Sequence, residues 1–304
     1  MPVIHLYPRP PYDFSLSAAI FSGGDPHIRV YEHDIFRQSL EIGGDLALVE
    51  VSSEGSVEQP KLRLSLRSDS PFSKGRITVM KDLVSSMLNI DEDITPFYEA
   101  MDKDPVMADL TRRLRGLKAP TTPTVFEALV DSIIEQQISL KAAHSIENRL
   151  IRAVGSPLTL NGDTYYCYPT ADTLAATPDS AFRSCGLTLR KGEYIRDISR
   201  QILSGSLDLD QLRNYPDTES IISEMVKIRG IGRWTAELTI LRGLHRMDSF
   251  PADDVGVRRF LSQVYHNNEK VSSDTARVFA ERWGAWKGLA AYYLEVADLL
   301  GIAP

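Results

Sequence analysis

Two neighbouring aspartates, Asp253 and Asp254, end a Pro-Ala-Asp-Asp stretch, and an amphipathic pattern typical of a helix begins at Val255. A carboxylate at a helix N-terminus accepts hydrogen bonds from the first amides and is favoured in its ionised form. In a pocket that excludes water, such a charge stabilises the positive charge that develops on a sugar as a glycosidic bond breaks. Aspartate is also a common helix cap, so this stretch by itself leaves a structural and a catalytic role open.

A glycine turn lies about twenty residues upstream of these aspartates. The pattern predicts an amphipathic helix to about Lys227, the turn RGIG, and a second helix from Arg233 to about Leu241 that Gly243 closes. Glycine permits positive φ and close approach of another molecule, and the amides that open a helix carry partial positive charge. Such a hairpin can hold a DNA phosphate, although it can equally be plain helix packing. The residues predicted to contact phosphate are Gly230, Gly232, Arg233 and Thr235.

Residues 230–236 (GIGRWTA) and 251–254 (PADD) together resemble the helix-hairpin-helix-Gly/Pro/Asp motif of DNA glycosylases, particularly the 3-methyladenine DNA glycosylase II branch. Further similarity covers essentially the whole chain, in residues 10–13 (PPYD), Ser39-Leu40 near Gly43, residues 134–139 (IEQQIS) and residues 280–286 (AERWGAW). The resemblance implies that Asp254 is the catalytic carboxylate and that Asp253 is a cap or a neighbour.

Trp234 decides the expected reaction subtype. In the family, members that also cleave the DNA backbone carry a lysine nucleophile at this position, and tryptophan cannot form a Schiff base. The resemblance therefore implies a monofunctional enzyme in which water completes the displacement. An indole wall also suits cationic N-alkylated purines, although a tryptophan on a helical stripe can equally be core. Tyr292 and Tyr293 are further candidates for the base pocket or the core, because Leu238 and Glu295 replace the aromatic side chains that the family pattern predicts.

A base inside a duplex must be extruded before it can be excised, and a side chain must fill the gap. The turn at 136–138 between two predicted helices matches the family's DNA wedge, with Gln137 at the position that is often leucine; a polar interhelix turn is the alternative. Arg229 replaces the usual proline before the hairpin glycine, and its side chain is a candidate for a further phosphate contact. No cofactor is expected to be required, but the resemblance implies a Na⁺ or K⁺ at the hairpin, held by carbonyls near Val226, Ile228 and Ile231.

The elements that position these residues indicate an α+β fold. An N-terminal antiparallel β-domain with flanking helices is expected at residues 1–88, with strands near 28–31, 35–42, 46–51 and 62–66 and a helix near 74–89. A second helix is expected near 95–101. Residues 89–304 are expected to form an all-helical glycosylase body, with 156–168 as a loop. Within this body, the helix-hairpin-helix is expected at about 217–243 and the aspartate loop at 244–254. Thr124 and Glu127 form a capping box for one helix.

The overall charge of −7 and pI near 5.5 argue against nucleic acid when taken alone, because basic side chains supply most non-specific affinity for DNA. Residues 226–260 have a local surplus of basic side chains, namely Lys227, Arg229, Arg233, Arg242, Arg246, Arg258 and Arg259 against Glu237, Asp248, Asp253 and Asp254. We therefore expect double-stranded DNA as the partner, no membrane association and a monomer. Two cysteines are too few for a disulfide framework or a four-thiolate metal site.

The sequence thus predicts a base-excision-repair glycosylase that removes alkylated purines such as 3-methyladenine and leaves an abasic site. The expected location is the cytoplasm (nucleoid) of a prokaryote or the nucleus of a eukaryote. A glycosylase of the same fold that acts on oxidised or deaminated bases is one alternative. A DNA-binding protein without catalytic activity is another, and a bifunctional lyase is the least favoured.

Overall fold

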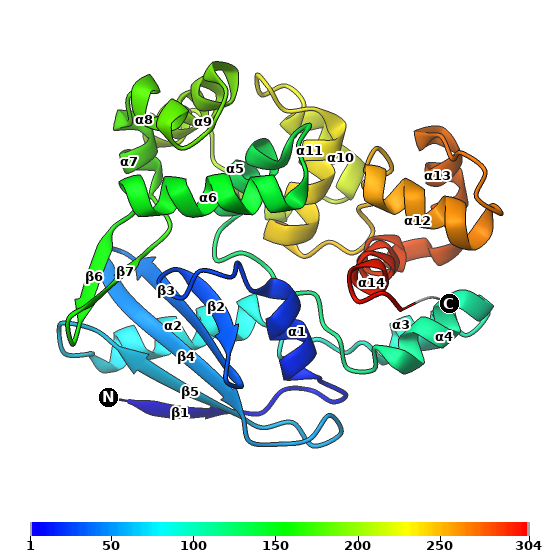
Figure 1. Cartoon of the computed structure of the whole chain (residues 1–304), viewed down its shortest axis with the longest axis horizontal. Coiled ribbons are helices and arrows are strands. Elements are labelled where there is room, and N and C mark those ends of the chain that lie inside the picture. The colour runs from blue at the N-terminus through cyan, green and yellow to red at the C-terminus, as the bar shows by residue number, and fades with distance from the viewer. Residues whose placement is uncertain (1, 303–304) are drawn as a thin grey trace.

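A computed structural model describes residues 2–302, and its N-terminal part is a five-stranded antiparallel sheet in the order β1-β5-β4-β3-β2 (Figure 1). The strands are β1 (Val3–Leu6), β2 (Arg29–Glu32), β3 (Ile35–Ile42), β4 (Asp45–Ser53) and β5 (Leu62–Arg67). The hydrophobic pattern predicts β2 to β5. It does not predict β1, which is only four residues long and stops shortly before a proline-rich stretch. Gly43 and Gly44, at φ 58° and 82°, form the two-residue turn between β3 and β4 that this pairing requires.

Two helices complete the core of the sheet. Helix α2 (Lys74–Met87) buries Met80 and Val84 there, and α1 (Phe14–Phe21) contributes Phe14. The sequence pattern does not predict α1, because this helix is short and its apolar residues show little amphipathic periodicity. Its start is nevertheless well defined, since the Asp13 carboxylate accepts a hydrogen bond of 2.9 Å from the amide of Leu16.

The rest of the chain is mainly helical and divides into two hydrophobic clusters. The helices are α3 (Thr95–Met101), α4 (Pro105–Arg113), α5 (Val125–Glu135), α6 (Leu140–Val154), α7 (Ala171–Ala176), α8 (Asp179–Ser184), α9 (Leu189–Leu203), α10 (Thr218–Met225), α11 (Arg233–Thr239), α12 (Val255–Tyr265), α13 (Ser273–Ala280) and α14 (Lys287–Leu299), with short helical turns η1 (Asp210–Asn214), η2 (Ile240–Leu244) and η3 (Glu281–Trp286).

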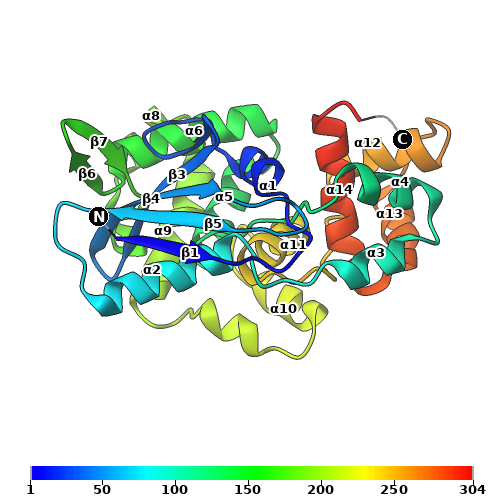
Figure 2. The ribbon, with the colours of Figure 1, turned by 90° about the horizontal axis from the view of Figure 1, so that it is seen from below.

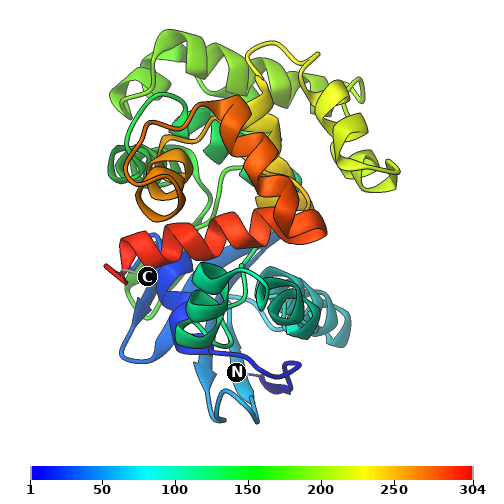
Figure 3. The same ribbon diagram turned by 90° about the vertical axis from the view of Figure 1, so that its right-hand side faces the viewer.

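The helices α3, α4 and α12–α14 form the end of the molecule opposite the sheet, as Figures 1 and 2 both show. Helix α14 packs against α12 and α4, and in Figure 3 it crosses between the N-terminal elements and α12. The helices α5, α9, α10 and α11 share the other cluster. Within residues 2–302, no helix combines the length and the apolar character that a membrane span needs.

The expectation of an all-helical body is wrong at residues 156–168, which are not a loop throughout. Strands β6 (Pro157–Leu160) and β7 (Asp163–Tyr166) form a hairpin there, and Asn161-Gly162 supplies the two left-handed residues of its turn at φ 54° and 94°. Leu158 packs with Leu48 of β4, and the amide of Tyr166 donates to the carbonyl of His27 at 2.8 Å. This packing against the N-terminal sheet stabilises strands that are too short to be stable alone.

Helix α5 links the sheet to the helical part. As predicted, the Thr124 hydroxyl caps α5 by accepting from the amide of Glu127 at 3.0 Å. The Glu127 side chain, which was expected to complete the capping box, is buried. Its carboxylate instead faces the Arg29 guanidinium of β2 at 3.7 Å. Arg29 also pairs with Glu147 of α6 at 3.3 Å. The position of α5, and of the turn at its C-terminal end, is thereby tied to the sheet.

Candidate active site

The predicted hairpin consists of α10, a turn and α11. Gly230 has φ 89°, and a Cβ atom there would lie 2.3 Å from the ring of Tyr194, so both conformation and space require glycine. Gly232 precedes α11 as its N-cap residue and has nothing within 4 Å of an added Cβ. The amides that open α11 therefore begin at an open, exposed surface. Gly243 does not close the second helix as expected: η2 continues to Leu244, and His245 in the left-handed region ends it.

Trp234 and Asp254 meet at the centre of the site. The indole Nε1–H of Trp234 donates to Oδ2 of Asp254 at 3.1 Å. The other carboxylate oxygen, Oδ1, accepts from the amides of Gly256 at 2.8 Å and Val257 at 3.1 Å. Asp254 is thus the N-cap of α12, and it is only partly buried. Three N–H donors hold this carboxylate in one orientation beside an indole ring.

The two candidate tyrosines of α14 face different surroundings. The ring of Tyr293 is fully buried 4.9 Å from that of Phe97, and its hydroxyl donates to the carbonyl of Leu117 at 2.7 Å. We therefore assign Tyr293 to the core and not to the base pocket. Adjacent helical residues point about 100° apart, so Tyr292 lies on a different face. Tyr292 is partly exposed as a residue, although its hydroxyl is buried and has no hydrogen-bond partner among the described residues.

Glu295, one helical turn beyond Tyr292, brings a second carboxyl group close to Asp254. Burial raises the pKa of Glu295 to about 8, and the negative charge of Asp254 adds to this effect, whereas Arg242 opposes it. Arg242 itself donates to the Glu135 carboxylate at 2.6 Å. Leu238, the other position where an aromatic was expected, is buried at 5% exposure. The surroundings of Asp254 are therefore more polar on the α14 side than the family pattern implies.

The predicted wedge turn is anchored to the hairpin. Gln137 is exposed and has φ 59°, which turns the chain between α5 and α6. Its neighbour Gln136 donates through Nε2 to the carbonyl of Gly230 and to the hydroxyl of Thr235, both at 3.0 Å. Lys191 of α9 donates to the carbonyls of Ile134 at 2.8 Å and Gln136 at 2.6 Å. The sequence did not single out Gln136 or Lys191, because these contacts depend on tertiary structure.

The side chains predicted to contact phosphate are partly engaged within the protein. Thr235 is buried at 2% exposure and its hydroxyl is bound by Gln136, so only its backbone amide, in the first turn of α11, remains for a ligand. Arg233 pairs with Glu219 and, at 2.9 Å, with Glu237. The guanidinium of Arg229 pairs with the carboxylates of α9, with Glu193 at 3.0 Å and Asp197 at 2.9 Å.

The carbonyls proposed to hold a monovalent cation lie in the turn after α10. Val226 follows α10 as its C-cap, and the carbonyl of Ile228 accepts from the amide of Ile231 at 3.1 Å. A carbonyl oxygen has two lone pairs, so the Ile228 carbonyl keeps one for a cation beside its bond to the Ile231 amide. Within residues 2–302, no group of three or more His, Cys, Asp or Glu side chains could hold a metal ion. Cys167 and Cys185 are both free and buried.

Two clefts of the structure lie away from Asp254. One, of about 590 Å³, lies on α13 beside Phe279 and Arg282. The other, of about 520 Å³, lies between Glu41 at the end of β3, the start of α5 and residues 205–211. Neither is lined by Trp234, Asp254 or Glu295.

A family model described as "HhH-GPD superfamily base excision DNA repair protein" matches residues 130–287, just over half of the chain. The chain belongs to the HhH-GPD superfamily. The range matched by the HhH-GPD model contains the turn at Gln137, the hairpin, Trp234 and Asp254, whereas Tyr292 and Glu295 lie beyond it.

Relatives within this superfamily cover most of the chain. A "DNA-3-methyladenine glycosylase" of Bacillus subtilis is 30% identical over 266 residues, which is 86% of each chain. A "Putative DNA-3-methyladenine glycosylase YfjP" from the same organism is 27% identical over 290 residues, covering 94% of this chain and 95% of that protein. The solved "3-methyladenine dna-glycosylase from Archaeoglobus fulgidus" has 26% identity and a TM-score of 0.86, covering 99% and 100% of the two chains.

Proposed function

We propose that this HhH-GPD protein is a monofunctional DNA glycosylase that excises N-alkylated purines such as 3-methyladenine and leaves an abasic site in base excision repair. The observation that carries the proposal is the hydrogen bond of 3.1 Å from Trp234 to Asp254. Trp234 stands where lyase members of the family have a lysine, and Asp254 is the proposed catalytic carboxylate. The relatives named DNA-3-methyladenine glycosylase support the substrate class.

In this mechanism Asp254 stabilises the sugar as it acquires positive charge. The bond between C1′ and the purine nitrogen breaks, and its electron pair leaves with the base, which neutralises the charge of an alkylated purine. Water then adds to C1′ and loses a proton to solvent. Asp254 acts through the charge of its carboxylate, whose orientation the amides of Gly256 and Val257 fix. Trp234 has no amine with which to form a covalent adduct.

The extruded base would bind beside Trp234, Tyr292 and Glu295, next to the Asp254 carboxylate. An indole face next to a cationic purine contributes roughly 0.5–2 kcal/mol. Gln137, exposed at the tip of its turn, would fill the gap left in the duplex and hydrogen-bond the orphaned base.

The DNA duplex would be held at the hairpin. A phosphate at the start of α11 would accept from the backbone amides of residues 232–235, and Arg233 would approach it by exchanging Glu219 for the phosphate. A Na⁺ or K⁺ on the carbonyls of Val226, Ile228 and Ile231 would add a positive charge next to that phosphate. We further propose that the protein acts as a monomer on double-stranded DNA, in the nucleoid or the nucleus where its substrate lies.

A panel of duplexes, each with one lesion, tests the substrate class. The set contains 3-methyladenine, 7-methylguanine, 8-oxoguanine, hypoxanthine and undamaged DNA, and base release is measured at saturating enzyme. Release of the alkylated purines well above the others is the expected result. Preferential release of 8-oxoguanine or hypoxanthine would indicate the alternative glycosylase. Lesion-independent, salt-sensitive binding without release would indicate a DNA-binding protein without catalytic activity, and a borohydride-trapped covalent adduct would contradict the role of Trp234.

A further inference from the structure

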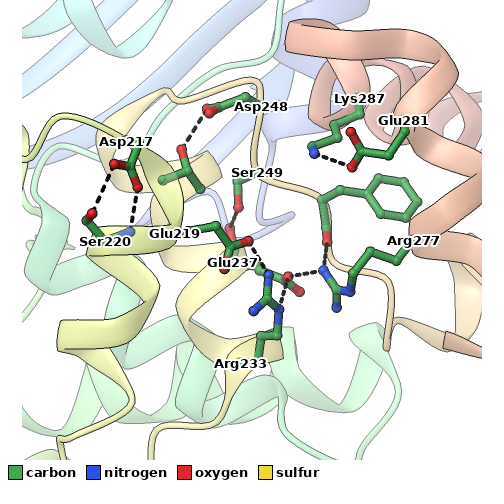
Figure 4. Close-up of polar contacts among 12 residues, drawn as sticks. Asp217, Glu219, Ser220, Arg233, Glu237, Asp248, Ser249, Arg277, Glu281 and Lys287 are labelled. Carbon is green, nitrogen blue, oxygen red and sulfur yellow. Dashed lines mark hydrogen bonds and ion pairs between the residues drawn. The ribbon is translucent and has the colours of Figure 1, made fainter. Parts of the chain in front are cut away.

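The irregular segment that leads to Asp254 is fixed by three helices, as Figure 4 shows. Thr218 of α10 donates to the Asp248 carboxylate at 2.7 Å, and the Ser249 hydroxyl donates to the carbonyl of Glu237 in α11 at 3.0 Å. Arg277 of α13 donates to the carbonyl of Phe250 at 3.5 Å. Asp248, Ser249 and Phe250 all lie in the aspartate loop (residues 244–254). Its contacts with α10 and α11 attach it to the hairpin, and Arg277 attaches it to α13.

Glu237 is the buried centre of this arrangement. It lies one turn after Trp234 on α11, and its side chain is only 1% exposed. Its Oε1 accepts from Arg233 at 2.9 Å and from Arg277 at 2.6 Å, whereas its Oε2 is buried and has no hydrogen-bond partner in the part of the chain that the structure describes. Burial raises the pKa of Glu237, although Arg277 and Arg233 both oppose this shift.

The buried pair of Glu237 and Arg277 costs free energy of folding that a purely stabilising contact would not need to cost. A buried carboxylate oxygen without a partner costs free energy, and apolar side chains of similar volume often replace a buried ion pair without loss of stability. The orphan oxygen therefore suggests that the pair serves a purpose other than stability. One such role follows from the geometry. Glu237 joins α11, which carries Trp234, to Arg277, which binds the aspartate loop.

Arg277 connects the two halves of the site. Besides Glu237 and Phe250, it faces the Asp253 carboxylate at 3.8 Å, directly before Asp254 in the chain. We propose that Arg277, paired with Glu237, is a positioning residue that sets Asp254 relative to Trp234 and the hairpin. Its loss then lowers the rate of base release and leaves DNA affinity nearly unchanged. This inference rests on the proposed function, since it concerns the placement of the proposed catalytic carboxylate.

Arg277→Ala and Arg277→Lys, with Lys287→Ala as a matched control, test the proposal kinetically. Lys287 is drawn in the same close-up as Arg277, and its ammonium donates to the Glu281 carboxylate, so its loss removes one positive charge from the same region (Figure 4). We expect the single-turnover rate of alkylpurine release to fall roughly 10- to 100-fold in Arg277→Ala, since small displacements of reacting groups cost this much. Arg277→Lys should recover part of that loss, because it keeps the charge but not the planar fork.

The dissociation constant for DNA with an abasic-site analogue separates positioning from binding. We expect it to change no more in Arg277→Ala than in Lys287→Ala. A rate in Arg277→Ala equal to that of Lys287→Ala would overturn the proposal. So would a loss of affinity as large as the loss of rate, because Arg277 would then contribute to DNA binding.

A double variant, Glu237→Met with Arg277→Met, addresses the case in which single variants fail to fold. If the pair were only structural, this apolar pair would keep both stability and rate; we expect it to keep stability and lose rate. Hydrogen exchange gives a readout that does not need activity. The amides of Gly256 and Val257 bind Asp254, and we expect both to exchange faster in the double variant than in Lys287→Ala. Unchanged exchange would contradict the proposal even if the wild type proved inactive on alkylated DNA.

Discussion

At the scale of single residues, Asp254 combines two roles that the sequence presents as alternatives. Its Oδ1 caps α12 through the amides of Gly256 and Val257, while Oδ2 receives the Trp234 indole N–H. The helix cap orients the carboxylate and leaves the other oxygen toward the aromatic side chain. Capping α12 therefore also holds the Asp254 carboxylate in the orientation in which it would act on a sugar.

Glu295→Gln tests the second carboxyl group of the site. Because burial raises the pKa of Glu295 to about 8, with Asp254, Glu135 and Asp298 adding to the shift and Arg242 opposing it, the side chain is neutral at pH 7 and ionises above pH 8. The new negative charge attracts a cationic base. We expect the ratio of 7-methylguanine to hypoxanthine release by the wild type to rise about three- to tenfold between pH 7 and 9.

The Glu295→Gln variant should show a flat ratio over the same range, because the amide does not titrate. Rates for both lesions are measured under single-turnover conditions at each pH. A flat wild-type ratio, or a rise that persists in the variant, would show that Glu295 does not face the base.

Sequence patterns identify residues of this site only where the contact is local or the motif is specific. Trp234 and Asp254 belong to one motif and could be predicted. Tyr292 and Tyr293 could not be told apart, since which of them is buried depends on how α14 packs against Phe97 and Leu117. The same packing places Glu295 near Asp254, and no pattern within α14 carries that information.

At the scale of elements, the wedge turn and the hairpin behave as one unit. Gln136 binds the carbonyl of Gly230 and the hydroxyl of Thr235, and Lys191 of α9 binds the carbonyls that end α5. A phosphate docked at α11 would therefore fix the position from which Gln137 would enter the duplex. This coupling gives the buried Thr235 hydroxyl a role inside the protein and not in direct contact with DNA.

Gly230→Ala and Gly232→Ala separate the two roles of the hairpin glycines. At Gly230, an added Cβ meets the ring of Tyr194 at 2.3 Å and φ is 89°, so we expect a loss of roughly 1–3 kcal/mol in the free energy of unfolding. At Gly232, φ is −93° and the space is open, so stability should be nearly unchanged, whereas affinity for duplex DNA should fall because the Cβ occupies the approach of the phosphate.

Urea denaturation and fluorescence anisotropy with a labelled duplex measure these two effects. Equal stabilities for the two variants would show that the turn tolerates alanine at Gly230. Unchanged DNA affinity in Gly232→Ala would exclude the start of α11 as the phosphate site.

The β6–β7 hairpin shows where the sequence signal for an element is too weak. Asn161-Gly162 is a strong turn signal, but the flanking strands have four residues each, and their apolar side chains need Leu48 of a distant strand to become buried. Longer elements with clear caps, such as α5 after Thr124 and α6 after Ser139, could be predicted because their signals lie within the element.

At the scale of the whole molecule, a buried cluster of charges joins the sheet to the helices. Arg29 of β2 faces Glu127 of α5 and Glu147 of α6, and Tyr168 donates to Asp131 at 2.7 Å. Three buried carboxyl groups around one arginine cannot all be charged at low cost. Accordingly, burial raises the pKa of Glu127 to about 8, and the charge of Glu147 adds to this shift while Arg29 opposes it.

Glu127→Gln tests this cluster through the pH dependence of stability. Because the folded-state pKa of Glu127 exceeds its ordinary value, its contribution to stability is complete below about pH 4.5 and is lost as pH rises through 8. The variant does not titrate there. We expect the stability of the wild type relative to Glu127→Gln to fall by at least about 1.4 kcal/mol from pH 5 to 9 in urea denaturation. A difference that stays constant or grows with pH would contradict the assigned protonation.

The distribution of charge over the molecule also explains why composition is a poor guide to its partner. The chain has a net charge of −7, and the side chains of Arg229 and Arg233 on the hairpin are paired with carboxylates. Affinity for DNA would then come from backbone amides at the start of α11 and from exchange of these carboxylates for phosphate. The net charge of the chain includes neither the backbone amides nor the exchange of carboxylates for phosphate. The hairpin motif therefore predicts the partner better than composition does.

The most direct test of the account compares the wild type with Asp254→Asn on DNA that contains 3-methyladenine. Asparagine keeps the helix cap and the size of the side chain but removes the charge, so the variant should fold and bind DNA normally. Glu281→Gln, which removes an exposed carboxylate of η3, serves as the control for loss of one negative charge. We predict that single-turnover base release falls by about 10³-fold in Asp254→Asn and is retained in Glu281→Gln. Base release by Asp254→Asn at the wild-type rate would contradict the central role of this carboxylate.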